Sequence, residues 1–433
     1  MYHLKSKLLE WSYSLSSLRK STILNRFTKV FYVDAFVKVS SLLLLPLFLK
    51  LMSQEEYAKY CYILAIISVV ALVFNFGLYA AQSKIYSDSK ESNKAGAIFT
   101  INIILIFILA ISMFILYGSG ADYFLIKKLL SKEIDYERYR VLIPIGVIIS
   151  VYTIMLFNFF MVTEQIKKAQ IHNILRVLMG TVLTVAALYA IPGDKSFIRM
   201  EVLFFSECLL LIIFLTFYVK AMKIWFDKSI ALNASKIGFP IMISAVFGIF
   251  INFTDKFFLA HYATWDDQSV YYLSISYASI ITVVYGSFQS IWLPMFLREK
   301  DDIKNFLKTK KVIAKSIICL GILGLLIWIL VFSLLYFSII NNKYNNVLII
   351  LPIMIISNIL ISLTGILSNY TIYWNATHIA ALFSFILACI SIPLNMFSAK
   401  YYGIYGVSVA SVILNLIFLL FYFKFMKNRM TFL

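Results

Sequence analysis

The chain has 433 residues, of which 61% are hydrophobic and 14% are charged, and its formal net charge is +18. Soluble globular proteins are about half apolar and a quarter charged, so this composition excludes a water-soluble fold. The positive charge lies in the connectors between apolar runs, which indicates contact with anionic membrane lipids and not with nucleic acid. The four Cys lie far apart without metal-ligand spacing, which disfavours a disulfide framework or a zinc site.

Twelve apolar runs are each long enough to cross a bilayer, which takes about 20 residues as a helix. Their hydrophobicity has a helical period, which predicts an all-α membrane protein and disfavours a β-barrel. The predicted spans cover residues 30–51, 57–81, 96–118, 140–163, 171–191, 200–220, 236–260, 270–294, 312–337, 346–368, 377–398 and 402–424.

Lys and Arg are divided unevenly between the connectors on the two sides of these spans. The side that holds the N-terminus has 25 of them, and the opposite side has 11. Because cytoplasmic loops are rich in Lys and Arg, this asymmetry predicts that both termini are cytoplasmic. These sides are called inner and outer below.

The order of spans and polar segments predicts two lobes. Spans one to six (residues 30–222) and seven to twelve (residues 237–433) have the same orientation, and a basic linker at 223–236 separates them. Residues 1–29 place Leu and Trp at spacings of three and four among Lys and Arg. That pattern favours an amphipathic helix on the inner membrane surface, with a mobile basic tail as the alternative.

The second and eighth spans carry similar polar patterns. A shift of 214 residues aligns Tyr57 with Tyr271 and Asn75 with Gln289, which suggests an internal repeat. Such residues either line a cavity or join helices by hydrogen bonds. The polar stripe of the eighth span consists of Tyr271, Ser274, Thr282, Tyr285 and Gln289.

Six charged side chains are singled out within the predicted spans, where a charge is costly unless it has a partner or faces water. Asp34 precedes Lys38 by one helical turn, so these two can pair. Arg176 and Glu207 lie in neighbouring spans, where they can form a salt bridge. Asp255 and Lys256 lie toward the outer end of their span and are expected to extend to the membrane surface. The six are Asp34, Lys38, Arg176, Glu207, Asp255 and Lys256.

The alternative to such structural roles is a hydrated transport cavity. Lys38 and Arg176 would bind a phosphate or a sugar carboxylate. Buried carboxylates have raised pKa values and can hold a proton or Na⁺, so Asp34, Glu207 and Asp255 are candidates for ion coupling. Sugar rings and hydroxyls would contact the stripe of the eighth span together with Tyr57, Asn75 and Asn252.

Several local motifs extend over nearly the whole chain. Residues 51–60 (LMSQEEYAKY) follow the first span, and residues 238–259 combine an early Pro with Asn-Phe-Thr-Asp-Lys. Trp292 and Pro294 close the eighth span. Near the end stand Leu394, Asn395, Tyr402, Gly403, Gly406 and Ala410. With these motifs the chain resembles polysaccharide flippases of the Wzx type, although Lys256 stands where that family usually has Arg. The flippases belong to the multidrug/oligosaccharidyl-lipid/polysaccharide (MOP) exporter superfamily.

This resemblance implies a V-shaped pair of six-helix lobes around a central cavity in the bacterial cytoplasmic membrane. The implied cargo is an oligosaccharide linked through pyrophosphate to undecaprenol, moved to the outer leaflet for O-antigen or a related polysaccharide of the cell surface. H⁺ or Na⁺ would be the coupling ion, and no other cofactor is expected. A polysaccharide polymerase and a chain-length regulator are possible partners. In antiporters of the superfamily a first-span Asp binds the coupling ion, but Asp34 is closer to the inner end of that span.

Two other functions are compatible with a twelve-span chain. A drug or organic-cation antiporter of the multidrug and toxin extrusion (MATE) type has the same fold, but would favour an acidic, more apolar cavity. A membrane glycan polymerase usually has a large catalytic outer loop, whereas the longest outer connector here is about 119–139. No catalytic motif is found, so the chain is predicted not to be an enzyme.

Overall fold

The computed structural model describes residues 40, 42–131, 133–374 and 376–430. The basic segment at 1–29 and the candidate residues Asp34 and Lys38 therefore lie outside the described residues. Leu42–Leu51 is the described apolar helical part of the first predicted span.

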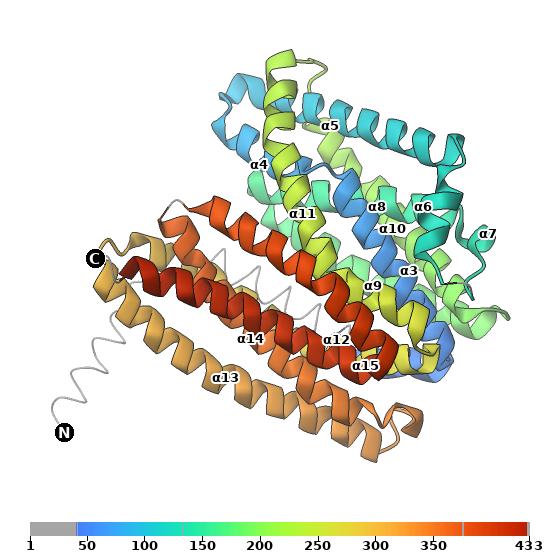
Figure 1. Cartoon of the computed structure of the whole chain (residues 1–433). Coiled ribbons are helices and arrows are strands. Elements are labelled where there is room, and N and C mark those ends of the chain that lie inside the picture. The colour runs from blue at the N-terminus through green and yellow to red at the C-terminus, as the bar shows by residue number, and fades with distance from the viewer. Residues whose placement is uncertain (1–39, 41, 132, 375, 431–433) are drawn as a thin grey trace.

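The described residues form helices joined by short turns, with no strand among them (Figure 1). The outer connector contains α6 (Ala121–Leu129) and α7 (Tyr136–Tyr139), and a short 3-10 turn, η2 (Asn342–Tyr344), lies in another. The other helices are α3 (Gln54–Phe74), α4 (Leu78–Asp88), α5 (Glu91–Met113) with its π-helical end η1 (Phe114–Gly118), α8 (Leu142–Val162), α9 (Ile166–Ala190), α10 (Lys195–Lys220), α11 (Lys228–Tyr262), α12 (Trp265–Arg298), α13 (Asp302–Tyr336), α14 (Val347–Tyr373) and α15 (Thr377–Met430).

With the exception of the second span, these helices confirm the predicted helical spans that the structure describes. Ten helices in the described part of the chain are long and apolar enough to cross a membrane. One of them, α15, contains the last two predicted spans, because the chain reverses at Gly403, whose φ is +54°. The second predicted span is broken, since Phe76 and Gly77 have positive φ values and separate α3 from α4.

Polar side chains fix where several helices begin. Ser53 and Glu56 form a capping box at the start of α3, each side chain bonding the other residue's backbone N–H. The N–H groups that open a helix have no partner within it, so a side-chain oxygen there defines the helix start. Further caps of this kind are Asp194 for α10, Asp227 for α11, Thr264 for α12 and Asp301 for α13.

The helices form two lobes that share α11. Helices α3 to α10 pack together, and α12 to α15 form the second group (Figure 1). The inner half of α11 packs against α4 and α5, whereas its outer half packs against α15. This helix begins at Lys228, so the predicted linker at 223–236 is partly helical.

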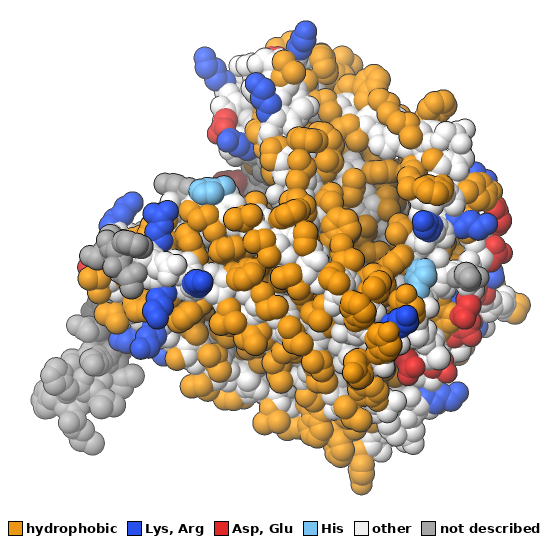
Figure 2. All heavy atoms as spheres, viewed as in Figure 1, with side chains coloured by type: hydrophobic (Ala, Val, Ile, Leu, Met, Phe, Trp, Pro, Cys, Tyr) orange, Lys and Arg blue, Asp and Glu red, His pale blue; other side chains and the backbone are white. Residues whose placement is uncertain are grey.

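The surface matches a protein that spans a membrane. Figure 2 shows hydrophobic side chains over the middle of the helices, with Lys, Arg, Asp and Glu gathered toward their ends. Exposed apolar residues such as Phe107, Leu178 and Leu325 lie within spans. Acyl chains would cover these side chains without the cost of contact with water.

Candidate functional site

The two lobes meet on the outer side, where α3 contacts α12. The side chain of Gln54 donates hydrogen bonds to Ser269 Oγ at 3.2 Å and to the Lys343 carbonyl at 3.3 Å. Deeper in the interface, the ring of Tyr62 lies 6.1 Å from that of Trp265. Tyr57 is buried in the same interface. The outer ends of the lobes are thus held together by polar and aromatic contacts.

An ion pair joins α9 and α10 near the middle of both helices. Arg176 Nη2 lies 2.6 Å from Glu207 Oε1, and the Nε of the same arginine donates to that oxygen at 2.7 Å. The Glu207 side chain is 5% exposed, but that of Arg176 is 44% exposed. His172 is buried one turn before Arg176, with its ring against Phe214. One side of the guanidinium therefore remains accessible although the carboxylate is enclosed.

The helix geometry shows which way this accessible side faces. Ile171, Leu178 and Val182 are the exposed apolar residues around this part of α9. At 100° per residue they lie on the opposite side of α9 from Arg176. Gly180, four residues after Arg176, is buried against Leu203 and Ser206 of α10. Arg176 consequently extends from the face that packs on α10, away from the lipid-facing residues.

Arg199 is a cationic site residue that the sequence did not single out. Its guanidinium carbon lies 3.9 Å from the ring centroid of Phe48 and 4.0 Å from that of Tyr60, at cation–π distance. Its Nη1 is 3.4 Å from Met52 Sδ. No carboxylate of the described residues forms an ion pair with it. The signal was available, because the cap at Asp194 starts α10 early enough to place Arg199 inside the helix.

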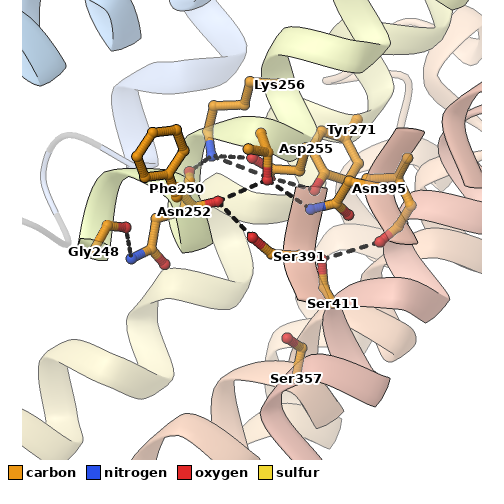
Figure 3. A network of polar contacts seen from close by, with 12 residues as sticks. Gly248, Phe250, Asn252, Asp255, Lys256, Tyr271, Ser357, Ser391, Asn395 and Ser411 are labelled. Carbon is orange, nitrogen blue, oxygen red and sulfur yellow. Dashed lines mark hydrogen bonds and ion pairs between the residues drawn. The ribbon is translucent and has the colours of Figure 1, made fainter. Parts of the chain in front are cut away.

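A second charged cluster lies in the C-terminal lobe (Figure 3). Lys256 Nζ is 3.1 Å from Asp255 Oδ2, and the Tyr271 hydroxyl donates to the same oxygen at 2.7 Å. Beside them Asn395 of α15 donates to Thr254 Oγ1 at 2.9 Å, and Ser391 donates to the Phe250 carbonyl. Neighbouring polar groups of α11 therefore join it to α12 through Tyr271 and to α15 through Ser391 and Asn395.

The direction of Lys256 differs from the expectation that it reaches the membrane surface. Its side chain is 19% exposed and Nζ turns back to the carbonyl of Asn252, at 2.6 Å. The neighbouring carboxylate, itself fixed by Tyr271, provides a partner within the helix bundle. The direction of the Lys256 side chain is therefore set by its ion pair with Asp255 and not by its distance from the membrane surface.

The polar stripe of α12 points largely at neighbouring helices. Gln289 donates to Asn369 Oδ1 of α14 at 2.6 Å, and Tyr285 packs on Gly365 of the same helix. Ser274 and Thr282 donate to carbonyls of their own helix. With Tyr271 bonded to Asp255, the stripe joins α12 to α11 and to α14.

The remaining predicted site residues do not gather around one point. Asn75 is buried at the end of α3 and accepts a hydrogen bond from the Tyr79 N–H. Asn252 is exposed on α11 and donates to the Gly248 carbonyl. Among the described residues no three His, Cys, Asp or Glu side chains form a possible metal site.

Outside the spans, one buried carboxylate organises the longest outer connector. Asp122 Oδ2 accepts from the Tyr136 hydroxyl at 2.6 Å and from Arg140 Nε at 2.7 Å. Burial acts to raise the pKa of Asp122, but these two hydrogen bonds outweigh it and hold the pKa below its usual value. The carboxylate thus stays charged and ties α6 to the start of the following span.

Comparison with known proteins places this arrangement in a family. A family model described as "Polysaccharide biosynthesis protein" matches residues 29–300. No curated protein matches the chain in sequence.

Two solved structures illustrate how widely the fold is shared. An inward-facing multidrug resistance MATE family transporter of the MOP superfamily is 12% identical, with a TM-score of 0.70 over 92% of this chain and 98% of its own. The lipid II flippase MurJ, in an inward closed conformation, is 16% identical, with a TM-score of 0.64 over 90% of this chain and 87% of its own. Since the family model covers more than half of the chain, the protein belongs to the polysaccharide biosynthesis protein family, and it has the helical fold of MATE transporters and MurJ.

Proposed function

We propose that this protein moves an oligosaccharide linked to undecaprenyl pyrophosphate from the inner to the outer leaflet of a bacterial cytoplasmic membrane, for O-antigen or a related polysaccharide. The polysaccharide biosynthesis family and the fold shared with a MATE transporter and the flippase MurJ support a translocating role without catalysis. A pyrophosphate with several sugars cannot enter hydrocarbon unaided, because its polar groups would lose their hydrogen bonds to water.

The observation that carries the proposal is the accessible guanidinium of Arg176 at mid-span. It is held by Glu207 and turned away from lipid, so it can bind an anionic head group by charge-assisted hydrogen bonds. Arg199, surrounded by aromatic rings, is a second cation for the same purpose. Lys38, from the first span, belongs to the same proposal, although it lies outside the described residues.

Translocation can be measured with purified protein in liposomes and a fluorescent lipid-linked oligosaccharide whose sugar is quenched from outside. We expect Arg176→Gln to lower the initial rate about tenfold or more, as removal of one charge-assisted contact does. The control is Arg298→Gln, which removes one exposed charge at the inner end of α12. A native rate for Arg176→Gln would refute the assignment. Export of an organic-cation dye without movement of the lipid-linked sugar would instead favour the MATE-type antiporter.

The proposal also includes coupling of transport to the movement of H⁺ or Na⁺. Glu207 and Asp255 are each buried within a span beside a cationic partner, and Asp34 is a third candidate outside the described residues. If either described carboxylate carries H⁺ or Na⁺, its amide variant should move substrate at a rate independent of the imposed ion gradient. A polymerase and a chain-length regulator remain the partners that such a product would require.

A further inference from the structure

Two cavities adjoin at the outer end of the first span. The first has a volume of about 350 Å³ and is apolar. It lies between the first span and the C-terminal lobe, and its walls include Leu43 and Leu47 on one side and Ile280, Leu330 and Leu334 on the other. Leu43 and Leu330 are also exposed at the surface of the spans, so the cavity is open toward the membrane.

The second cavity is larger, about 470 Å³, and polar side chains line it together with Leu49 and Met52. It lies between the start of α3 and the outer connector of α13 and α14, and is lined in part by Gln54, Asn341, Asn342 and Lys343. Lys50 lines both cavities, and Ser338 of the polar one is followed in the chain by Ile339 of the apolar one. The two volumes therefore form one site with an apolar and a polar end, each within the usual range for a ligand pocket, about 300–1,000 Å³.

The polar end is cationic. Lys50 and Lys343 are exposed, and no ion pair with a described acidic residue involves either of them. The nearest acidic residues in sequence, Glu55 and Glu56, are bound to Lys59 and to the backbone of Ser53 and Lys195. The ammonium groups of Lys50 and Lys343 can bind an anion that carries more than one negative charge. The neighbouring side-chain amides can form hydrogen bonds with hydroxyl groups of the same ligand.

We propose that this site holds the prenyl pyrophosphate end of the lipid-linked saccharide on the outer side of the membrane, which rests on the function proposed above. The prenyl chain lies along Leu43, Ile280 and Leu334. The pyrophosphate contacts Lys50 and Lys343, and the first sugar contacts the amides of Asn341 and Asn342. One apolar cavity of about 350 Å³ beside two lysines fits a diphosphate with a single lipid chain better than a glycerophospholipid, which has two acyl chains and one phosphate. The site would bind the cargo as it leaves the protein.

The experiment uses the full chain in phosphatidylcholine nanodiscs and a heptaprenyl pyrophosphate probe with a photoreactive group on its chain. We expect cross-links in residues 42–50 and 330–339, located by mass spectrometry. Lys50→Gln with Lys343→Gln should reduce labelling about tenfold, since two charge-assisted contacts are removed. Lys127→Gln with Lys128→Gln removes the same charge from exposed lysines of α6 and should leave labelling unchanged.

A second pair of variants tests the apolar end. Leu43→Trp fills the cavity and should reduce labelling several-fold, whereas Leu325→Trp, at an exposed position of α13 outside both cavities, should not. Full labelling of the double lysine variant, labelling spread over all lipid-facing helices, or equal competition by phosphatidylglycerol would each overturn the proposal. Translocation by the native protein is measured separately: transport with labelling elsewhere refutes this site alone, and labelling here without transport refutes only the proposed function.

Discussion

At the scale of single residues, Asp122 connects three parts of the outer connector. Its carboxylate receives hydrogen bonds from Tyr136 and Arg140, and the guanidinium of Arg140 lies over the ring of Tyr123. The Asp122 side chain is fully buried, so the loss of its charge cannot be compensated by water.

We expect Asp122→Asn to lower the midpoint of thermal unfolding near neutral pH, because hydrogen bonds to a charged group contribute about 1.5–3 kcal/mol. The folded-state pKa of Asp122 lies below its unfolded value, so this stabilisation is complete above the unfolded pKa, about 3.9, and is lost as the pH falls through the folded pKa. Native protein and variant should therefore differ near neutral pH and converge on acidification, as measured by circular dichroism. Glu133→Gln, at an exposed position of the same connector, is the control. Equal midpoints near neutral pH would contradict the assignment.

The charged residues also show how far single positions can be predicted. Their sequence positions were sufficient to suggest a bridge between Arg176 and Glu207, because both lie at mid-span in neighbouring helices. The sequence positions did not indicate that Lys256 pairs with Asp255, or that Gln289 forms a hydrogen bond with Asn369. Such partners depend on how helices rotate against each other, which a periodic pattern within one helix does not encode.

At the scale of elements, the junction of α4 and α11 depends on two glycines in close contact. A Cβ on Gly238 would lie 2.4 Å from the carbonyl oxygen of Phe76, and a Cβ on Gly77 would lie 2.4 Å from that of Gly238. The sequence predicted one continuous span across 57–81, because hydropathy does not detect the left-handed residues Phe76 and Gly77. The break between α3 and α4 allows the backbone at Gly77 to come close to that of Gly238.

We expect Gly238→Ala to destabilise the protein by about 1–3 kcal/mol, because the new methyl group meets backbone that cannot move aside. Gly248→Ala in the same helix meets nothing within 4 Å, and should be neutral or stabilising by up to about 1 kcal/mol. The midpoints of thermal unfolding of the two variants provide the comparison. If both variants unfold like the native protein, the glycine contact is not a constraint.

At the scale of the whole molecule, hydropathy predicted the helices, whereas the contacts that α11 makes with both groups of helices were not predicted. The division at 223–236 assigned α11 to the C-terminal lobe, whereas its inner half packs on α4 and α5. A boundary read from composition marks where polar residues collect. It does not show which lobe a long helix will contact.

The proposed transport requires the outer contact between the lobes to open. Gln54→Cys with Ser269→Cys, in a chain whose four native Cys are replaced, places two thiols across this contact, where Gln54 Nε2 and Ser269 Oγ are 3.2 Å apart. Because a Cys side chain is shorter than that of Gln, a short thiol-reactive cross-linker that is cleaved by reduction is used to join them. We expect the cross-link to abolish translocation in liposomes and reduction to restore it, while each single variant stays active. Unchanged transport by a fully cross-linked sample would show that the lobes do not separate there.

The shared helix has a mechanical consequence. From Pro240 to Tyr262 the outer arm of α11 contains roughly 22 residues, and at 1.5 Å per residue it is about 33 Å long. A bend of about 10° at Pro240, where a backbone hydrogen bond is missing, would displace the far end by about 6 Å. A small change of backbone torsion near one face of the bilayer would thus move the opposite end of α11 by about the width of a sugar ring. In this way α11 can act as a lever between the two lobes.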